Sequence, residues 1–163
     1  MQNLLIIEDN LIYSHFLVNS ICKELNNIRL YSIVDTGKKA LEILKKEKID
    51  IIILDLKLPD ISGIDIINYI EGNNLSQYYA SIIVLTNEID LLNQVINKKS
   101  VFTYSSKIDN INSFIDKVRE LSKEKQDISL KNSIKEKGTL QSNATFLCFF
   151  LQILTGCPVK LYF

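Results

Sequence analysis

Short apolar runs alternate with longer amphipathic stretches between Met1 and Leu121, and this alternation constrains the fold more than any other feature of the chain. Continuous apolar runs are typical of strands buried on both faces, and their alternation with helical patterns indicates a parallel sheet covered by helices. The sequence therefore predicts an α/β fold with a doubly wound, five-stranded parallel sheet. The expected strands are Leu4–Ile7, Arg29–Val34, Asp50–Leu54, Ser81–Leu85 and Val101–Tyr104.

The stretches between these runs carry apolar residues at helical spacing, as Ile111, Ile115, Val118 and Leu121 do. The expected helices are Leu11–Leu25, Gly37–Lys46, Ile64–Glu71, Ile89–Lys98 and Ile111–Leu121. A residue with a short polar side chain precedes four of them, which is typical of a helix N-cap. The candidate caps are Asn10, Thr36, Ser62 and Asn110.

The overall composition argues against several classes of protein. Nineteen basic residues cancel nineteen acidic ones, so no field of one sign is available to attract nucleic acid or an anionic membrane. The three cysteines are widely spaced and form no CxxC, so neither a disulfide framework nor a zinc site is indicated. No signal-peptide pattern opens the chain, and the apolar run 144–154 is shorter than the about 20 residues that span a bilayer. We expect a protein of the reducing cytoplasm that binds neither nucleic acid nor membrane.

Distinctive polar residues stand at the ends of four predicted strands. Glu8 and Asp9 follow the first strand, Asp55 the third, Thr86 the fourth, and Lys107 lies just beyond the fifth. The carboxyl ends of parallel strands share one edge of the sheet, where open α/β sheets bind their ligands. We therefore expect these side chains to converge on one site.

Carboxylates held close together repel one another, and a hard cation such as Mg²⁺ relieves that repulsion. An ionised aspartate beside such a cation can attack a phosphoryl group, while an ammonium and a hydroxyl neutralise the phosphoryl oxygens. Taken singly, Asp55 or Thr86 could be a capping residue and Lys107 a surface lysine. Their joint placement favours the chemical interpretation, with Mg²⁺ as cofactor.

Four segments carry a resemblance to the receiver domain of bacterial response regulators, which covers nearly all of residues 2–124. They are LLIIEDN (4–10), IIILDLKLPDISGID (51–65), IIVLTNE (82–88) and VFTYSSK (101–107). The second is the most specific, since Asp55, Pro59 and Gly63 stand at the family's spacing. The resemblance implies a flavodoxin-like fold with strand order 2-1-3-4-5.

The resemblance also implies roles for individual residues. Glu8 and Asp9 are similar to the acidic pair that holds Mg²⁺, and Asp55 to the phosphoacceptor, which is a further metal ligand. Lys57 stands where a backbone carbonyl completes the metal shell. Thr86 resembles the hydroxyl that turns toward the phosphoryl group, and Tyr104 the aromatic residue whose ring moves with it.

The implied function is that of a response regulator receiver in a two-component phosphorelay. A histidine kinase or phosphotransfer protein would supply the phosphoryl group, and the face formed by residues 89–98, 101–104 and the last helix would switch. A second receiver or an output domain would dock there. The domain would be no enzyme beyond catalysing its own phosphorylation and dephosphorylation. We also expect an ion pair between Lys57 and Glu88 at the mouth of the site, modulating the lifetime of the phosphoryl group.

Ile108 departs from the family pattern, because proline usually follows the lysine, commonly after a cis peptide bond. A cis bond without proline costs about 3 to 4 kcal/mol, so the cis or trans state of the Lys107–Ile108 bond stays open. Because of this departure, a pseudo-receiver that only binds partners stays open as an alternative. A phosphatase of the haloacid dehalogenase group is disfavoured, because it needs an aspartate where Lys57 stands. A flavin-binding flavodoxin is disfavoured because EDNLIYSH contains no phosphate loop.

The amino-acid composition changes after residue 124. Residues 125–138 are charged and are expected to form a linker that can extend the last helix. Residues 139–163 are apolar, and their end, LQILTGCPVKLYF, resembles the opening of diguanylate cyclase domains without its Asn and Arg. This tail is either a truncated output segment or vector-derived, since QSNA (141–144) is typical of a cloning scar.

Overall fold

A computed structural model describes the backbone of residues 1–73, 81–107 and 109–155, and the side chains of the same residues except Ile89 and those of 134–155. The chain divides into two compact units, Met1–Lys123 and Glu124–Phe163. The first unit contains the whole sheet and the candidate site, and the description that follows concerns this unit unless stated otherwise.

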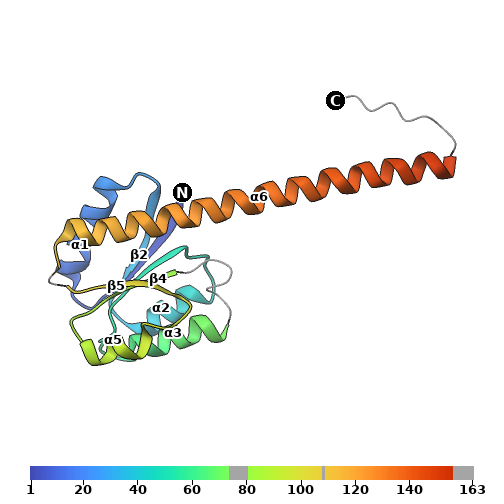
Figure 1. Cartoon of the computed structure of the whole chain (residues 1–163). Coiled ribbons are helices and arrows are strands. Elements are labelled where there is room, and N and C mark those ends of the chain that lie inside the picture. The colour runs from blue at the N-terminus through green and yellow to red at the C-terminus, as the bar shows by residue number, and fades with distance from the viewer. Residues whose placement is uncertain (74–80, 108, 156–163) are drawn as a thin grey trace. The chain divides into compact units, whose positions relative to one another are not determined.

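Five parallel strands form one sheet in the order β2-β1-β3-β4-β5, as the sequence and the family resemblance predict (Figure 1). The strands are β1 Gln2–Ile7, β2 Ile28–Val34, β3 Ile51–Leu54, β4 Ser81–Leu85 and β5 Val101–Ser105. The helices are α1 Leu11–Glu24, α2 Gly37–Leu44, α3 Gly63–Gly72, α5 Ile89–Val95 and α6 Ile111–Thr155. The strand order reverses between β1 and β3, so the crevice for a ligand opens at the carboxyl ends of these two strands.

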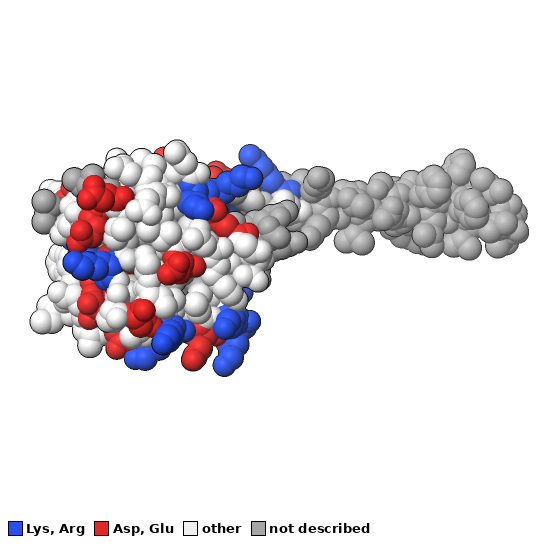
Figure 2. Space-filling model, turned by 90° about the horizontal axis from the view of Figure 1, so that it is seen from below, with Lys and Arg blue, Asp and Glu red and all other residues white. Residues whose placement is uncertain are grey.

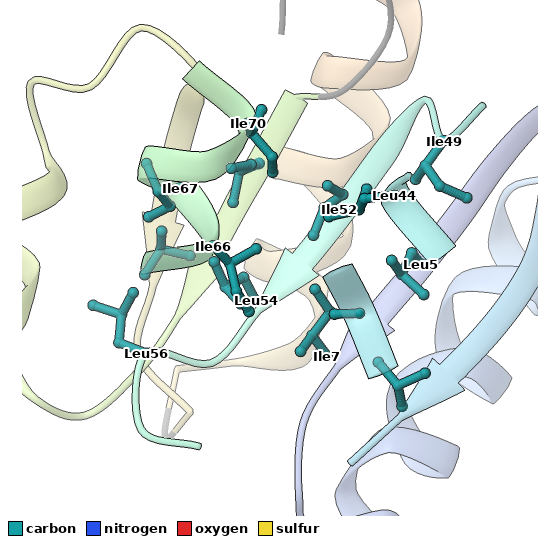
Figure 3. Packing of buried hydrophobic residues seen from close by; sticks show 14 of the residues in the cluster. Leu5, Ile7, Leu44, Ile49, Ile52, Leu54, Leu56, Ile66, Ile67 and Ile70 are labelled. Atoms are coloured by element: carbon teal, nitrogen blue, oxygen red, sulfur yellow. The ribbon is translucent and has the colours of Figure 1, made fainter. Parts of the chain in front are cut away.

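Helices cover both faces of the sheet because successive strand residues point to opposite sides. Leu5 and Ile7 pack with α2, α3 and α5 in one cluster, part of which Figure 3 shows around Ile52 and Leu54. Leu4 and Ile6 pack with α1 and the first turns of α6 in a second cluster on the other face. The apolar runs of β1, β3 and β4 are buried on both faces, whereas the edge strands β2 and β5 contain polar residues and are buried only in part.

Helices α1, α2 and α3 begin and end within two residues of the predicted bounds, and α5 and α6 differ more. Helix α5 ends at Val95 rather than at Lys98. Helix α6 continues to Thr155, far beyond the predicted end at Leu121. Residues 122–137 contain no Gly or Pro and are rich in Lys and Glu, which favour helix, so the predicted linker has a helical backbone. Of the predicted tail, residues 139–155 are helical and 156–163 lie outside the described residues; the assignment of residues 125–163 as linker and tail stays a prediction.

The predicted N-caps are confirmed at three of four positions. Asn10 accepts a hydrogen bond from Tyr13 N at 3.0 Å, and Ser62 accepts one from Ile64 N at 3.2 Å. Asn110 accepts one from Asn112 N at 2.9 Å.

Thr36 precedes α2 as predicted, but its side chain makes no capping hydrogen bond. The carboxylate of Asp60 caps this helix from the loop after β3, accepting from Gly37 N at 2.8 Å and from Lys38 N at 2.9 Å. A negative charge at a helix N-terminus also interacts favourably with the helix dipole. The cap of α2 is therefore a tertiary contact over more than 20 residues of sequence.

The Asp60→Ala variant is expected to lower the thermal unfolding midpoint at neutral pH. Burial tends to raise the pKa of Asp60, but the N–H groups of Lys38 and Gly37 lower it, and the net pKa lies below its ordinary value of 3.8. A carboxyl whose pKa is depressed by folding stabilises the folded state above its unfolded pKa and loses that contribution as pH falls through the folded pKa. The difference between wild type and variant should shrink below pH 3.8 in scanning calorimetry, and a difference independent of pH would contradict the capping role.

The surface carries charges of both signs. Figure 2 shows acidic and basic side chains interspersed among neutral ones on the face that it presents. Within the part of the chain that the structure describes, no helix has the length and apolar character needed to cross a bilayer.

Candidate functional site

The pairing of β1 with β3 brings the first two elements of the site together. Ile7 is the register partner of Leu54, so the residues that follow them leave the sheet side by side. Asp55 N donates to Ile7 O at 2.9 Å, which extends the ladder by one bond and fixes the backbone of Asp55. At the other side of the crevice, Thr86 N donates to Ser105 O at 3.1 Å. The sheet itself therefore positions the predicted residues at one edge.

Three carboxylates gather at this edge. Glu8, Asp9 and Asp55 each offer an oxygen within 4.8 Å of the others. Glu8 is 1% and Asp55 4% exposed, whereas Asp9 is open to solvent. The predicted convergence of these three side chains is confirmed.

Lys107 neutralises part of this charge. Its Nζ lies 2.7 Å from Asp55 Oδ2 and 2.8 Å from the Glu8 carboxylate. Burial raises the pKa of Glu8, and the ammonium of Lys107 offsets this only in part. Burial tends to lower the pKa of Lys107, but its hydrogen bonds to Asp55 and Glu8 raise the pKa above its ordinary value. Lys107 is therefore a cation held between two buried carboxylates.

Both oxygens of Glu8 depend on the same ammonium. Glu8 Oε1 accepts from Asn10 N at 3.2 Å and from Lys107 Nζ. Glu8 Oε2 is buried and, among the described residues, has no donor in hydrogen-bonding geometry, although Lys107 Nζ is close to it. The three carboxylates outnumber the ammonium of Lys107 beside them, so negative charge is in excess among these residues. A hard divalent cation bound by oxygen ligands would neutralise this excess charge, so the donor set fits Mg²⁺.

The carboxylates open into a pocket of about 350 Å³. Residues that follow β1, β3, β4 and β5 line it: Asp9, Asp55, Lys57, Leu58, Pro59, Thr86, Asn87, Glu88 and Lys107. Asp55 presents both oxygens to polar partners here, because Oδ1 accepts from Lys57 N at 3.1 Å while Oδ2 accepts from Lys107. The pocket has room for a small anionic group beside Asp55.

Gly63 holds the loop that forms one wall of the pocket. Its N–H donates to Leu56 O at 3.0 Å. A Cβ at this position would lie 2.5 Å from Asp55 O and 2.8 Å from Leu56 Cα, and neither backbone atom can move aside cheaply. The glycine eight residues after Asp55 is therefore needed for the backbone of Asp55 to take its place.

A family model for the response regulator receiver domain matches residues 4–120. The chain belongs to this family. It is a family of signalling domains in two-component systems that work with histidine kinases, and not a family of enzymes. The match and the acidic pocket together make residues 4–120 a receiver domain with Glu8, Asp9 and Asp55 at its centre.

Solved receivers resemble this one in fold. A structure described as the signal receiver domain of a Luxo repressor protein from Vibrio parahaemolyticus is 26% identical with a TM-score of 0.69, covering 79% of this chain and 95% of that one. A CheY-like receiver from Methanospirillum hungatei is 19% identical with a TM-score of 0.65, covering 78% and 98%. The response regulator TrrA from Thermotoga maritima, in complex with Mg²⁺ and BeF, is 23% identical with a TM-score of 0.63, covering 74% and 99%. A search of curated proteins found no match.

The two predicted switch residues of the receiver lie in different surroundings. Thr86 is 5% exposed, lines the pocket, and accepts from Glu88 N at 3.1 Å through Oγ1. Tyr104 is 44% exposed on β5, and Lys117 Nζ lies 6.0 Å from the centre of its ring. Their switching roles stay predictions, as does the role of the Lys57 carbonyl.

The predicted ion pair at the mouth of the pocket is confirmed. Lys57 Nζ lies 3.3 Å from Glu88 Oε1, and both side chains are largely exposed. Exposed pairs of this kind contribute little to stability, so its interest is its place at the pocket.

Sequence reasoning missed Asn87 and Tyr13. Asn87 Oδ1 accepts from Ser106 Oγ at 2.8 Å and from Lys107 N at 3.0 Å. Tyr13 OH donates to Lys107 O at 3.3 Å. Both residues contact the loop of Lys107. Asn87 follows Thr86 at the end of β4, so its strand-end placement could have indicated it, whereas nothing near Tyr13 in the sequence indicates its contact. Ile108 lies outside the described residues, so the cis or trans state of the Lys107–Ile108 bond stays open.

Proposed function

We propose that the receiver is a phosphorylation-controlled response regulator domain in which Asp55 accepts a phosphoryl group from a histidine kinase or phosphotransfer protein. One observation carries the proposal. Asp55 is a buried carboxylate that lines a pocket, and Lys107 Nζ lies 2.7 Å from its Oδ2. Glu8 and Asp9 lie close enough to bind a metal ion together with it. The cytoplasm is the expected compartment.

Glu8, Asp9 and Asp55 would hold Mg²⁺ through carboxylate oxygens, with the Lys57 carbonyl as a further ligand. When bound, the ion would neutralise charge on the phosphoryl oxygens. The convergence of three carboxylates beside a single ammonium supports this assignment. The Mg²⁺ and BeF in the Thermotoga maritima relative support it by family likeness.

In the transfer, a carboxylate oxygen of Asp55 attacks the phosphorus of a phosphohistidine. The P–N bond breaks, an O–P bond forms, and the imidazole nitrogen leaves with the bonding electron pair and takes up a proton. Phosphoryl transfer depends mainly on positioning and charge neutralisation. Lys57 N and Lys107 Nζ orient the two oxygens of Asp55 before the attack.

The new phosphoryl group would compete with Asp55 and Glu8 for the ammonium of Lys107 and draw the Thr86 hydroxyl toward it. Glu88 N donates to Thr86 Oγ1 in the unphosphorylated protein, and Glu88 directly precedes α5, so movement of Thr86 would be transmitted to this helix. Movement of Thr86 and Tyr104 would then change the face formed by α5, β5 and α6, where a second receiver or an output domain would dock.

The test is uptake of phosphate from a small phosphodonor with Mg²⁺, followed by peptide mapping of the modified residue. Label on the peptide that contains Asp55, dependent on Mg²⁺, is the expected result. An unmodified chain under conditions that phosphorylate a known receiver would overturn the proposal in favour of a pseudo-receiver that only binds partners.

The Lys57→Ala and Glu88→Ala variants are expected to change the lifetime of the phosphoryl group by a similar factor of about two to ten. Their ion pair lies at the mouth of the pocket, so either substitution opens the same path for the attacking water. Decay of the phosphorylated protein after removal of the donor measures the lifetime. Lifetimes equal to that of wild type in both variants would contradict this role, and Lys39→Ala, which breaks an exposed pair on α2, is the matched control.

A further inference from the structure

The backbone of Lys107 is held on both sides by side chains from other elements. Its N–H donates to Asn87 Oδ1 at 3.0 Å, across 20 residues of sequence. Its carbonyl accepts from Tyr13 OH at 3.3 Å, across 94 residues. The Tyr13 ring also lies beneath the side chain, with 5.8 Å between its centre and Lys107 Nζ. Lys107 is thus contacted at its N–H, its carbonyl and its ammonium.

The residues beside Lys107 are restrained by other contacts. Asp109 Oδ2 accepts from Ser106 N at 2.9 Å and from Ser105 Oγ at 3.0 Å, which ties down the residues just after β5. The residue after Lys107 is Ile108, so no proline ring restricts the backbone there. Asn87 and Tyr13 add restraints on the backbone of Lys107 itself, and both come from outside its loop.

A lysine must be restrained if its ammonium is to stay at one position. Its ammonium sits on a flexible four-carbon stem, and the position of the Cα decides which acceptors it can reach. Here Nζ must lie within hydrogen-bonding distance of both Asp55 and Glu8. The aromatic ring beneath the ammonium attracts this cation and further limits the positions that Nζ can occupy.

We propose that Asn87 and Tyr13 are positioning residues that set the Lys107 ammonium against Asp55. Asn87 is exposed, and the Tyr13 ring packs half-buried against the second cluster, a contact that a change to Phe preserves. Both act through Lys107 and neither is assigned as a metal ligand. For phosphoryl uptake, the inference rests on the proposed function of Asp55.

The test uses Asn87→Ala and Tyr13→Phe, with Asn93→Ala and Tyr31→Phe as matched controls on α5 and β2. The first readout is independent of phosphorylation. Amide hydrogen exchange at Lys107 should become faster in Asn87→Ala, which removes the acceptor of that N–H, and stay as in wild type in the controls. We call the contacts of Asn87 and Tyr13 with Lys107 the Lys107 clamp. Unchanged amide exchange at Lys107 in Asn87→Ala would overturn the clamp, even if the protein proves not to take up phosphate.

The second readout is the rate of phosphoryl uptake with saturating Mg²⁺. Each variant should lose about three- to tenfold, the factor expected for one or two neutral hydrogen bonds. In the Lys107→Ala background the same substitutions should have no further effect, because they act through Lys107. Additive losses in that background would overturn the proposal and indicate that Asn87 or Tyr13 acts on the pocket directly.

A third measurement separates positioning from a general loosening of the pocket. Removing the clamp should leave the affinity for Mg²⁺ unchanged or raise it slightly, because a displaced ammonium repels the cation less. A fall in Mg²⁺ affinity together with slower uptake would overturn the proposal. If wild type takes up no phosphate while Lys107 exchange responds as expected, the proposed function of Asp55 fails and the clamp stands.

Discussion

The Asp55→Asn variant is expected to take up no phosphoryl group from a small phosphodonor, while keeping its fold. Asparagine fills the same space and retains an oxygen that can accept from Lys57 N, but its amide is no nucleophile toward phosphorus at neutral pH. Asp55 is 4% exposed, so the isosteric change is preferable to alanine, which would leave a void beside Lys107. Intact mass after incubation with donor and Mg²⁺ measures the uptake.

Two further variants make this result specific. Asp90→Asn removes an exposed carboxylate from the first turn of α5, outside the pocket, and should phosphorylate as wild type does. Asp9→Asn keeps the nucleophile but removes one metal ligand, so its uptake should fall and recover at higher Mg²⁺ concentration. Undiminished uptake by Asp55→Asn would place the acceptor elsewhere.

The Lys107→Ala variant is expected to be the least stable of the site variants without metal. It leaves Glu8 and Asp55, at 1% and 4% exposure, without the ammonium that lies 2.7 to 2.8 Å from both. Removing one partner of a buried ion pair costs about 3 kcal/mol, because the remaining charge stays desolvated. Urea denaturation in the presence of a chelator measures the loss.

Mg²⁺ should restore part of this stability, and the variant should bind Mg²⁺ more tightly than wild type does. The acidic cluster then has no internal cation that competes for its oxygens. Lys57→Ala is the matched control, since Lys57 lines the same pocket but is 76% exposed and pairs with Glu88. A Lys107→Ala protein with the denaturation midpoint of wild type in chelator would contradict the assignment of Lys107 as the neutralising cation.

The sheet and the acidic edge could be predicted because their causes are local or periodic. Strands buried on both faces leave unbroken apolar runs, as in Ile51–Leu54, and the sign survives without any knowledge of partners. Parallel strands end at a common edge, so polar residues placed directly after them must meet there. Glu8, Asp55 and Thr86 obey this rule.

Features that depend on contacts between distant segments could not be predicted in this way. Thr36 has the chemistry of an N-cap, yet Asp60 caps α2, because the loop after β3 reaches the helix N-terminus in the folded chain. The length of α6 was underestimated because charged residues at low apolar density are compatible with either a linker or a solvated helix.

The sequence by itself determined the α/β sheet, the family and the identity of the residues at the site edge, because periodicity and strand-end placement follow from the covalent chain. Only the tertiary structure decided how Lys107 is held. Its partners Asn87 and Tyr13 lie 20 and 94 residues away, and their hydrogen bonds depend on the relative positions of two loops and a helix. Such positions are set by the packing of the whole domain, and no segment of the chain carries them alone.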